Sequence, residues 1–190
     1  MKKPVISSVE IHPVLAQRWS PRSFQRQYKI ADSEVTGILE AARWSPSASN
    51  SQPWRFVVAH AGTPEFEKIS KTLAGFNANW APNASLYVVV TTQTLNADGS
   101  ARPWALYDAG IASANATTEA HHRGLAVHQI AGFDHEAIEK EFNFSAGLRP
   151  LTILVIGKQA PVEELTEEVL RAREEAKRER IPLSDLILNS

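Results

Sequence analysis

Residues 45–53, Ser-Pro-Ser-Ala-Ser-Asn-Ser-Gln-Pro, are the point at which the chain changes from a helical pattern to a strand pattern. Before them, apolar residues recur at helical spacing from Val35 to Ala42. This spacing predicts a helix over residues 32–43, and Asp32 is suited to cap it. The two prolines and four serines that follow favour turns, so the helix should give way to a loop.

Three apolar segments are predicted to be strands. They are residues 54–59 (Trp-Arg-Phe-Val-Val-Ala), 86–90 (Leu-Tyr-Val-Val-Val) and 151–156 (Leu-Thr-Ile-Leu-Val-Ile). Strands that are apolar along almost their whole length are typical of sheets that are covered on both faces. The chain is therefore expected to form a sheet enclosed by helices.

Two further segments have a helical composition. Residues 103–123 are rich in small side chains, which let another element approach closely, so we expect the central helix here. Residues 163–180 carry twelve charges in eighteen positions and only a thin apolar stripe, which predicts a largely solvated helix. The tail at residues 181–188 is apolar again and is costly to leave in water, so it should dock on another surface, for example that of a second subunit.

The length and composition are those of one globular domain. The 190 residues are 43% hydrophobic and contain no internal repeat, low-complexity tract or glycine-serine linker, so residues 1–190 are expected to form a single domain. With 20 basic and 21 acidic residues, the formal charge of -1 provides no field to attract nucleic acid or an anionic membrane. Neither is expected as a partner.

The cysteine count and the absence of long apolar runs bear on the compartment. The sequence has no cysteine, which excludes disulfides, thiolate nucleophiles and cysteine-ligated zinc or iron–sulfur sites. No run of about 18 apolar residues could span a membrane, and no apolar segment follows the basic start. These features predict a soluble, unexported protein of the cytoplasm.

A first polar constellation lies at residues 18–24, Arg-Trp-Ser-Pro-Arg-Ser-Phe. The guanidinium groups of Arg18 and Arg22 are forks suited to phosphate oxygens, and a hydroxyl such as that of Ser20 can add a neutral hydrogen bond. The pattern indicates a phosphate site, although a solvated turn would have the same composition.

The loop after the first predicted helix is a second constellation. The amide groups of Asn50 and Gln52 each offer a donor and an acceptor, and the edge of an uncharged heterocycle requires both. An ordinary turn is the alternative interpretation, because the same residue types favour turns.

A third constellation lies at residues 178–182, Arg-Glu-Arg-Ile-Pro, directly after Lys177. Cations near the C-terminal end of a helix interact favourably with the helix dipole, and this is the simpler interpretation of Arg178 and Arg180. The order of the three constellations along the chain supports a different interpretation of these two arginines.

In this order the three constellations resemble the nitroreductase family. Its members share an arginine-serine-arginine start, a Pro-Ser-x-x-Asn-x-Gln-Pro-Trp loop and a late basic pair before proline, and residues 46–54 are the most specific match. The resemblance extends from about Pro13 to Leu188. It includes Asp-Ala-Gly-Ile-Ala at 108–112, Gly-Leu at 124–125 and Gly-Phe at 132–133.

The resemblance implies an α+β fold with a mainly antiparallel central sheet flanked by helices. It also implies a homodimer that binds FMN at the subunit interface, with the C-terminal tail docked on the partner. The residues implied to meet the FMN phosphate, ribityl chain and pyrimidine edge are Arg18, Trp19, Ser20 and Arg22, with Arg178 and Arg180 closing on the phosphate. Those implied to reach the flavin from the other subunit are Pro46, Ser47, Ala48 and Asn50. Those implied to line the flavin ring are Asn77 and the backbone around Ala131 and Gly132.

Two positions depart from the family pattern. Trp80 stands where some similar nitroreductases have a lysine near the flavin, and Ala131 stands where some have a glutamate. An indole in place of an ammonium group adds a stacking surface and removes a charge, so Trp80 either favours a flat aromatic acceptor or simply packs in the protein.

For function, the resemblance implies hydride transfer from NAD(P)H to a small electron-poor acceptor, such as a nitroaromatic, quinone, enone or flavin, by a ping-pong mechanism. We expect no catalytic side chain, because FMN carries out the hydride chemistry. We also expect no metal, because the adjacent residues His121 and His122 would point about 100° apart on a helix. The alternative is a flavin-binding or flavin-consuming protein without nicotinamide-dependent turnover, since motifs for FMN alone do not distinguish the two.

Overall fold

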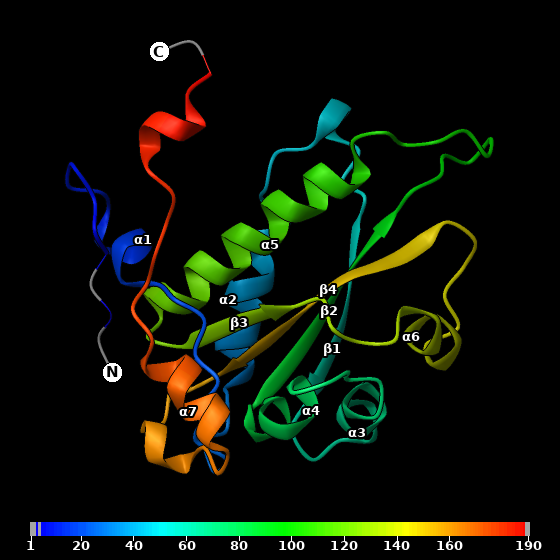
Figure 1. Ribbon diagram of the computed structural model, residues 1–190. Helices are drawn as coiled ribbons and strands as arrows, with labels where there is room; N and C mark the ends of the chain where they lie inside the picture. Colours follow the sequence, from blue (N-terminus) through cyan, green and yellow to red (C-terminus); the bar gives the residue numbers. More distant parts are fainter. Residues whose placement is uncertain (1–2, 4, 189–190) are drawn as a thin grey trace.

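The computed structural model describes Lys3 and residues 5–188, which form an α+β fold (Figure 1). The helices are α1 (Pro13–Gln17), α2 (Asp32–Arg43), α3 (Pro64–Ser70), α4 (Asn77–Trp80), α5 (Ala105–His122), α6 (His135–Glu141) and α7 (Glu168–Glu175). The strands are β1 (Trp54–His60), β2 (Leu86–Gln93), β3 (Ala126–Ile130) and β4 (Leu148–Gly157). Short 3-10 turns are η1 (Ala48–Asn50), η2 (Ala81–Asn83), η3 (Val162–Glu164) and η4 (Leu183–Leu186).

The four strands form one antiparallel sheet in the order β1-β2-β4-β3. Val89 in β2 lies between Val57 of β1 and Ile153 of β4. The three predicted strands are therefore confirmed, and β2 and β4 extend further than their apolar runs. The fourth strand, β3, was not predicted because it is short and has His128 and Gln129 in its second half, which interrupts the apolar pattern.

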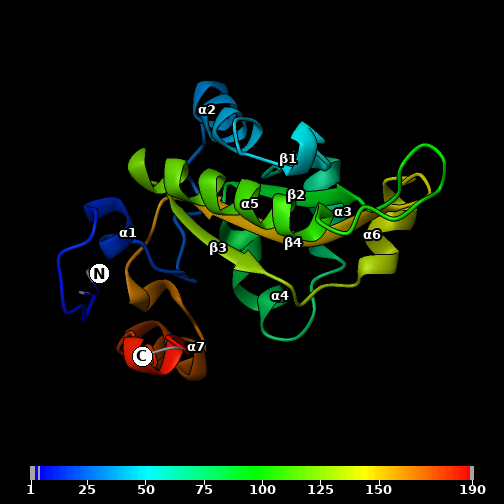
Figure 2. The ribbon, with the colours of Figure 1, turned by 90° about the horizontal axis from the view of Figure 1, so that it is seen from above.

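Both faces of the sheet are buried, as the apolar strands predict. Successive side chains of a strand point to opposite faces, so β2 contributes to two cores. Leu86, Val88 and Val90 belong to the core that α2 and α5 cover. Tyr87 and Val89 belong to the core that α3, α4, α6 and α7 complete. Figure 2 shows α2 and α5 on one side of the sheet and α4 on the other.

Helix α2 has the predicted bounds, but its N-terminal cap differs from the prediction. Asp32 is the first helical residue, and Ala31 is the N-cap with an extended backbone. The Glu34 carboxylate reaches back and accepts the Ala31 N–H at 2.9 Å. This contact satisfies the donor at the helix start without a capping side chain at Asp32.

Helix α5 is the predicted central helix. Its alanines Ala109, Ala112 and Ala116 are buried in the core shared with α2 and the sheet. Leu106 and Tyr107, near the start of the same helix, are exposed. The small residues therefore allow close packing inside, while a large apolar surface remains outside.

The predicted helix over residues 163–180 is wrong in its length. Helix α7 spans only Glu168–Glu175, and Ala176 already has an extended backbone (φ -52°, ψ 141°). The chain then runs past the N-terminal segment, where the Arg178 guanidinium donates to the carbonyl oxygens of Lys3 and Ala16. If the helix continued to residue 180, Arg178 would be carried away from these carbonyls. The long-range hydrogen bonds of Arg178 therefore favour the early end of α7.

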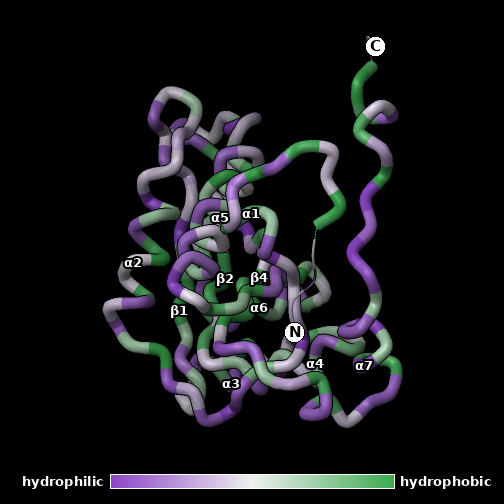
Figure 3. The backbone as a smooth tube through the Cα atoms, turned by 90° about the vertical axis from the view of Figure 1, so that its left-hand side faces the viewer, coloured by the Kyte–Doolittle hydropathy of each residue, from purple (hydrophilic) through white to green (hydrophobic). Residues whose placement is uncertain are grey.

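The C-terminal tail is exposed in the single chain. Ile181, Leu183, Leu186 and Leu188 are all more than half exposed. Figure 3 shows the tail standing apart from the body of the protein, with hydrophobic residues toward its end. Ile181, Leu183 and Leu186 line a cavity of about 800 Å³ together with Val5, Ile11 and Leu15 of the N-terminal segment, and they stay largely exposed. In the described part of the chain, no helix has the length and apolar character needed to cross a membrane.

Candidate functional site

The two ends of the described chain meet at a pocket of about 220 Å³, which we call the basic pocket. Its lining comes from the segment around α1 and from the segment that ends α7. The lining residues are Lys3, Arg18, Trp19, Ser20, Arg22, Arg173, Ala176, Lys177, Arg178 and Arg180. The fold thus brings the first and third constellations together, although they lie at opposite ends of the sequence.

Hydrogen bonds from side chains to main-chain carbonyl oxygens hold these two segments against each other. The Lys3 ammonium donates to the Ala176 carbonyl at 2.7 Å. The Arg178 guanidinium donates in return to the carbonyls of Lys3 at 3.1 Å and Ala16 at 2.6 Å. Arg178 therefore helps to build the pocket wall in addition to lining it.

Positive charge dominates the basic pocket. Burial lowers the pKa of Arg18, and the neighbouring Arg178 and Arg180 lower it further. Burial also lowers the pKa of Arg22, although the Glu174 carboxylate partly offsets this effect. None of the ion pairs formed by the described residues includes a cation of the pocket. Crowded cations that form no direct ion pair among the described residues favour a bound anion, and arginine forks suit phosphate oxygens in particular.

Asn77 and Gly132, which were predicted to line a flavin ring, are in direct contact. The Asn77 side-chain amide donates to the Gly132 carbonyl at 3.2 Å, and the backbone N–H of Ala74 donates to the same oxygen at 3.0 Å. A Cβ atom at Gly132 would lie 2.8 Å from Asn77 Nδ2, so any other residue here would require the Asn77 amide to shift. The adjacent residue Ala131 is exposed.

Trp80 packs in the core, so the hypothesis that it offers a stacking surface to an acceptor is wrong. Its side chain is only 1% exposed. The indole lies against the His128 ring, with centroids 4.6 Å apart, and against the Phe24 ring at 6.1 Å. His128 Nδ1 lies 2.9 Å from the Pro21 carbonyl, and burial together with Arg22 and Arg18 lowers the pKa of His128 to about 4. The imidazole is therefore a neutral packing partner at pH 7.

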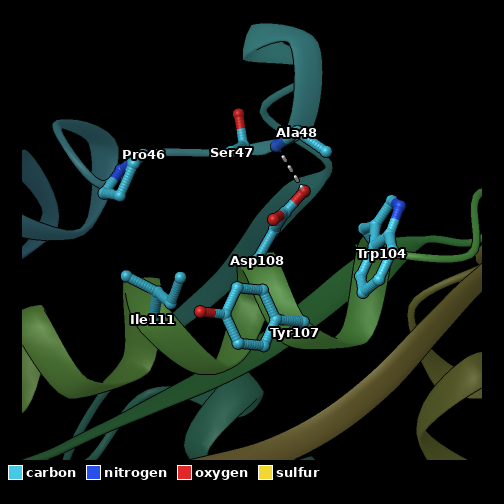
Figure 4. Close-up of a pocket in the computed structure, with 7 residues that line it drawn as sticks. All are labelled: Pro46, Ser47, Ala48, Trp104, Tyr107, Asp108 and Ile111. Carbon is cyan, nitrogen blue, oxygen red and sulfur yellow. Dashed lines mark hydrogen bonds between the residues drawn. The ribbon is translucent and has the colours of Figure 1, made fainter.

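The loop of the second constellation forms a separate pocket of about 300 Å³ against the start of α5 (Figure 4). Its lining is mostly apolar and consists of Pro46, Ser47, Ala48, Trp104, Tyr107, Asp108 and Ile111. The buried Asp108 carboxylate accepts the backbone N–H of Ala48 at 3.1 Å and joins the loop to the helix.

Within this loop the backbone adopts an uncommon conformation. Ser49, Asn50 and Gln52 all have positive φ angles, of 52°, 53° and 43°, a region that non-glycine residues seldom occupy. The Gln52 amide donates to the Asn50 carbonyl at 3.1 Å, and the Gln52 N–H donates to the Ser47 hydroxyl at 3.0 Å. Gln52 therefore holds the loop together, and Asn50 does not line the pocket.

The basic pocket and the loop pocket lie at opposite ends of α5. Asp108 holds the loop near the start of the helix, whereas His121 and Trp19 line one small cavity near its end. Asp108 and His121 are separated by about 20 Å at the helical rise per residue. One chain therefore does not bring the two groups of predicted site residues together.

Two acidic residues of the site, Asp108 and Glu174, had no assigned role in the sequence. Asp108 lies in a segment that resembles the family, but its pairing with Ala48 depends on tertiary packing. Glu174 is one of twelve charges in a segment predicted to be solvated, yet it is buried in the structure. No local pattern separates this residue from its exposed neighbours.

Comparison with known proteins identifies similar chains. The sequence profile described as the nitroreductase family matches residues 15–74 and 62–158. The chain is 31% identical over 176 residues to the oxygen-insensitive NAD(P)H nitroreductase of Salmonella typhimurium, a match that covers 86% of this chain and 80% of that enzyme.

Solved structures have the same fold. A crystal structure described as an oxidoreductase containing FMN has a TM-score of 0.90 and 29% identity, and the match covers 97% of this chain and 93% of the other. A nitroreductase family protein from Clostridium difficile 630 has a TM-score of 0.72 at 24% identity, over 93% of this chain and 95% of that one. The α+β architecture is thus shared with proteins of this kind.

Proposed function

This chain belongs to the nitroreductase family, and from that premise we propose that it is an FMN-dependent oxidoreductase. It transfers hydride from NAD(P)H to a small electron-poor acceptor, which is a nitroaromatic, a quinone, an enone or a flavin. Similarity to an oxidoreductase that contains FMN and to an NAD(P)H nitroreductase supports this assignment.

The observation that carries the proposal is the basic pocket. Seven cations line it, Lys3, Arg18, Arg22, Arg173, Lys177, Arg178 and Arg180. FMN ends in a phosphate monoester with up to two negative charges, and such a group fits a cavity whose cations form no direct ion pair among the described residues. Arg18, Ser20, Arg178 and Arg180 would hold the phosphate and ribityl chain, with Trp19 beside them.

The other predicted site residues have proposed roles around the flavin ring. Arg22, a half-buried residue that lines the basic pocket, would stand near the pyrimidine edge and stabilise negative charge there. Asn77 and the backbone at Ala131 and Gly132 would line the ring, supported by the contact between Asn77 and Gly132.

A homodimer completes the proposed site. Because Pro46, Ser47, Ala48 and Asn50 lie at the far end of α5 from the basic pocket, they would reach the flavin of the partner subunit. The exposed apolar residues of α5 and of the tail support such an interface, since surfaces of this kind usually lie against another protein. A two-fold interface creates two identical sites.

FMN, when bound, accepts and donates the hydride, so no side chain has to act as the redox group. The protein binds the cofactor, excludes water and positions the substrates. We propose a ping-pong order, in which the oxidised nicotinamide leaves before the acceptor enters the same pocket.

Two measurements test the proposal. The purified protein should release about one FMN per chain and no FAD, because the basic pocket closes on a terminal phosphate. Chromatography of the released cofactor identifies it. Finding FAD, or a colourless protein that fails to take up FMN, would overturn the proposal.

The second measurement separates the reductase from a flavin-binding or flavin-consuming protein without nicotinamide turnover. Anaerobic mixing of the FMN-loaded protein with NADH and with NADPH should rapidly bleach the yellow colour with at least one of them. A spectrum that stays oxidised with both would favour the alternative.

A further inference from the structure

Glu174 occupies an unusual position for a carboxylate. It lies in the last turn of α7, is 1% exposed, and is next to a pocket lined by cations. Its two oxygens accept backbone N–H groups from the other side of the pocket, Oε2 from Arg22 at 2.9 Å and Oε1 from Ser23 at 3.4 Å. The carboxylate therefore connects α7 to the main chain that carries the first constellation.

Glu174 binds the main chain and does not occupy the guanidinium donors of Arg22. None of the ion pairs among the described residues includes Glu174, and the Arg22 guanidinium has no hydrogen-bond partner within the described part of the chain. A carboxylate that formed a direct pair with Arg22 would occupy the donors that a phosphate or a flavin edge requires. Binding to the main chain avoids this competition.

The surroundings of Glu174 explain how a buried carboxylate is tolerated. Burial raises its pKa, whereas the N–H groups of Arg22 and Ser23 and the charges of Arg22 and Lys3 lower it. A buried charge is stable only when hydrogen bonds and opposite charges compensate for lost hydration. Ser23 adds a second anchor, because its hydroxyl donates to the Pro161 carbonyl at 2.5 Å.

We propose that Glu174 is a positioning residue for the cofactor site: by holding the main chain of Arg22 and Ser23 against α7, it sets the position of the Arg22 guanidinium. This inference rests on the proposed function, in which Arg22 binds FMN. Without the anchor, FMN binding would have to order this segment, and immobilising one long side chain lowers affinity by up to about tenfold.

Glu174→Gln tests the inference, with Glu175→Gln as the matched control. Both variants lose one negative charge from adjacent positions of α7, but Glu175 is exposed and makes no such contact. In Glu174→Gln, the new NH₂ group faces a backbone donor, so we expect FMN to bind about tenfold more weakly. In Glu175→Gln, removal of a negative charge should leave FMN affinity unchanged or slightly higher. Equal effects in both variants would overturn the inference.

A second measurement tests the contact between Glu174 and the main chain of Arg22 and Ser23 in the absence of FMN. Amide hydrogen exchange of the apo protein should show loss of protection at Arg22 and Ser23 in Glu174→Gln, while the amides of β2 keep theirs. Loss of protection throughout the protein would indicate only a general role in stability and would contradict a positioning role. If wild type fails to bind FMN, the proposed function fails, yet this measurement still tests the anchor.

Two further variants complete the test. In an Arg22→Ala background, Glu174→Gln should have little additional effect on FMN affinity, because residues that act through each other are not additive. Glu174→Asp keeps the charge and both oxygens but shortens the reach, so it should also weaken FMN binding even if Glu174→Gln folds poorly. Full additivity with Arg22→Ala, or wild-type affinity in Glu174→Asp, would overturn the inference.

Discussion

The backbone N–H of Ala48 donates a hydrogen bond to the buried carboxylate of Asp108, 3.1 Å away, and this contact attaches the loop after α2 to the central helix. The loop contains residues with positive φ angles, which cost free energy unless the surrounding structure holds them. Asp108 is therefore a structural support for residues that the proposed site places at the partner's flavin.

Replacement of Asp108 should loosen this loop. We expect Asp108→Ala to lower the free energy of unfolding by about 1–3 kcal/mol, since a charge-assisted hydrogen bond is lost in a buried place. FMN affinity should fall as well. Asp108→Asn keeps an acceptor oxygen and should lose less of both. Chemical denaturation and FMN titration measure the two effects, and equal losses in the two variants would show that the hydrogen bond is not the cause.

Arg22 and Arg180 should differ in their effects on the flavin. Arg22→Ala and Arg180→Ala should each weaken FMN binding by about tenfold or more, because each removes a charged donor. Only Arg22→Ala should also lower the reduction potential of the bound flavin, since a cation near the pyrimidine edge stabilises the reduced form more than the oxidised form. Spectroscopic titration against a reference dye measures the potential. The same potential in wild type and Arg22→Ala would contradict the role assigned to Arg22.

Flavin occupancy and subunit association should be coupled. If FMN binds the dimer more tightly than the monomer, it must shift the equilibrium toward the dimer. Sedimentation should therefore show that the apo protein dissociates more readily than the FMN-loaded protein. A monomer that carries its full complement of flavin would contradict the interface placement.

Heterodimers test which subunit supplies each part of a site. One subunit carries Asn50→Ala and the other carries Arg18→Ala together with Arg22→Ala. If the sites are shared, one composite site carries all three lesions and the other carries none, so half of the sites should bind FMN normally. Two equally impaired sites would mean that each chain builds its pocket alone.

The lowered pKa of His128 should make the folded protein less stable in mild acid. Its surroundings lower the pKa from 6.5 to about 4, so between these pH values the unfolded chain takes up a proton that the folded protein does not. Stability should therefore fall as the pH drops from 6.5 toward 4, by at most about 3 kcal/mol from this residue. His128→Gln should reduce this pH dependence, whereas His122→Gln, at an exposed position, should not. Unfolding curves at pH 7 and pH 5 measure the difference, and an unchanged slope in His128→Gln would exclude this explanation.

The sequence by itself determined the local elements whose patterns are strong. Apolar spacing predicted α2, and apolar runs predicted β1, β2 and β4, because burial on one or both faces requires apolar side chains at regular intervals. Prolines and serines predicted the loop between α2 and β1. The three polar constellations also identified the family, since their residue types and their order are readable without a structure.

Only the tertiary structure decided which of these residues meet. It ended α7 at Glu175, because Arg178 binds carbonyl oxygens near the other end of the chain. It buried Glu174 and joined it to the main chain of Arg22, although its sequence neighbours are solvated charges. Contacts between residues far apart in sequence leave no periodic pattern, because each depends on how whole elements pack. For the same reason, the position of the basic pocket at one end of α5, and of the loop at the other, became evident only in the folded chain.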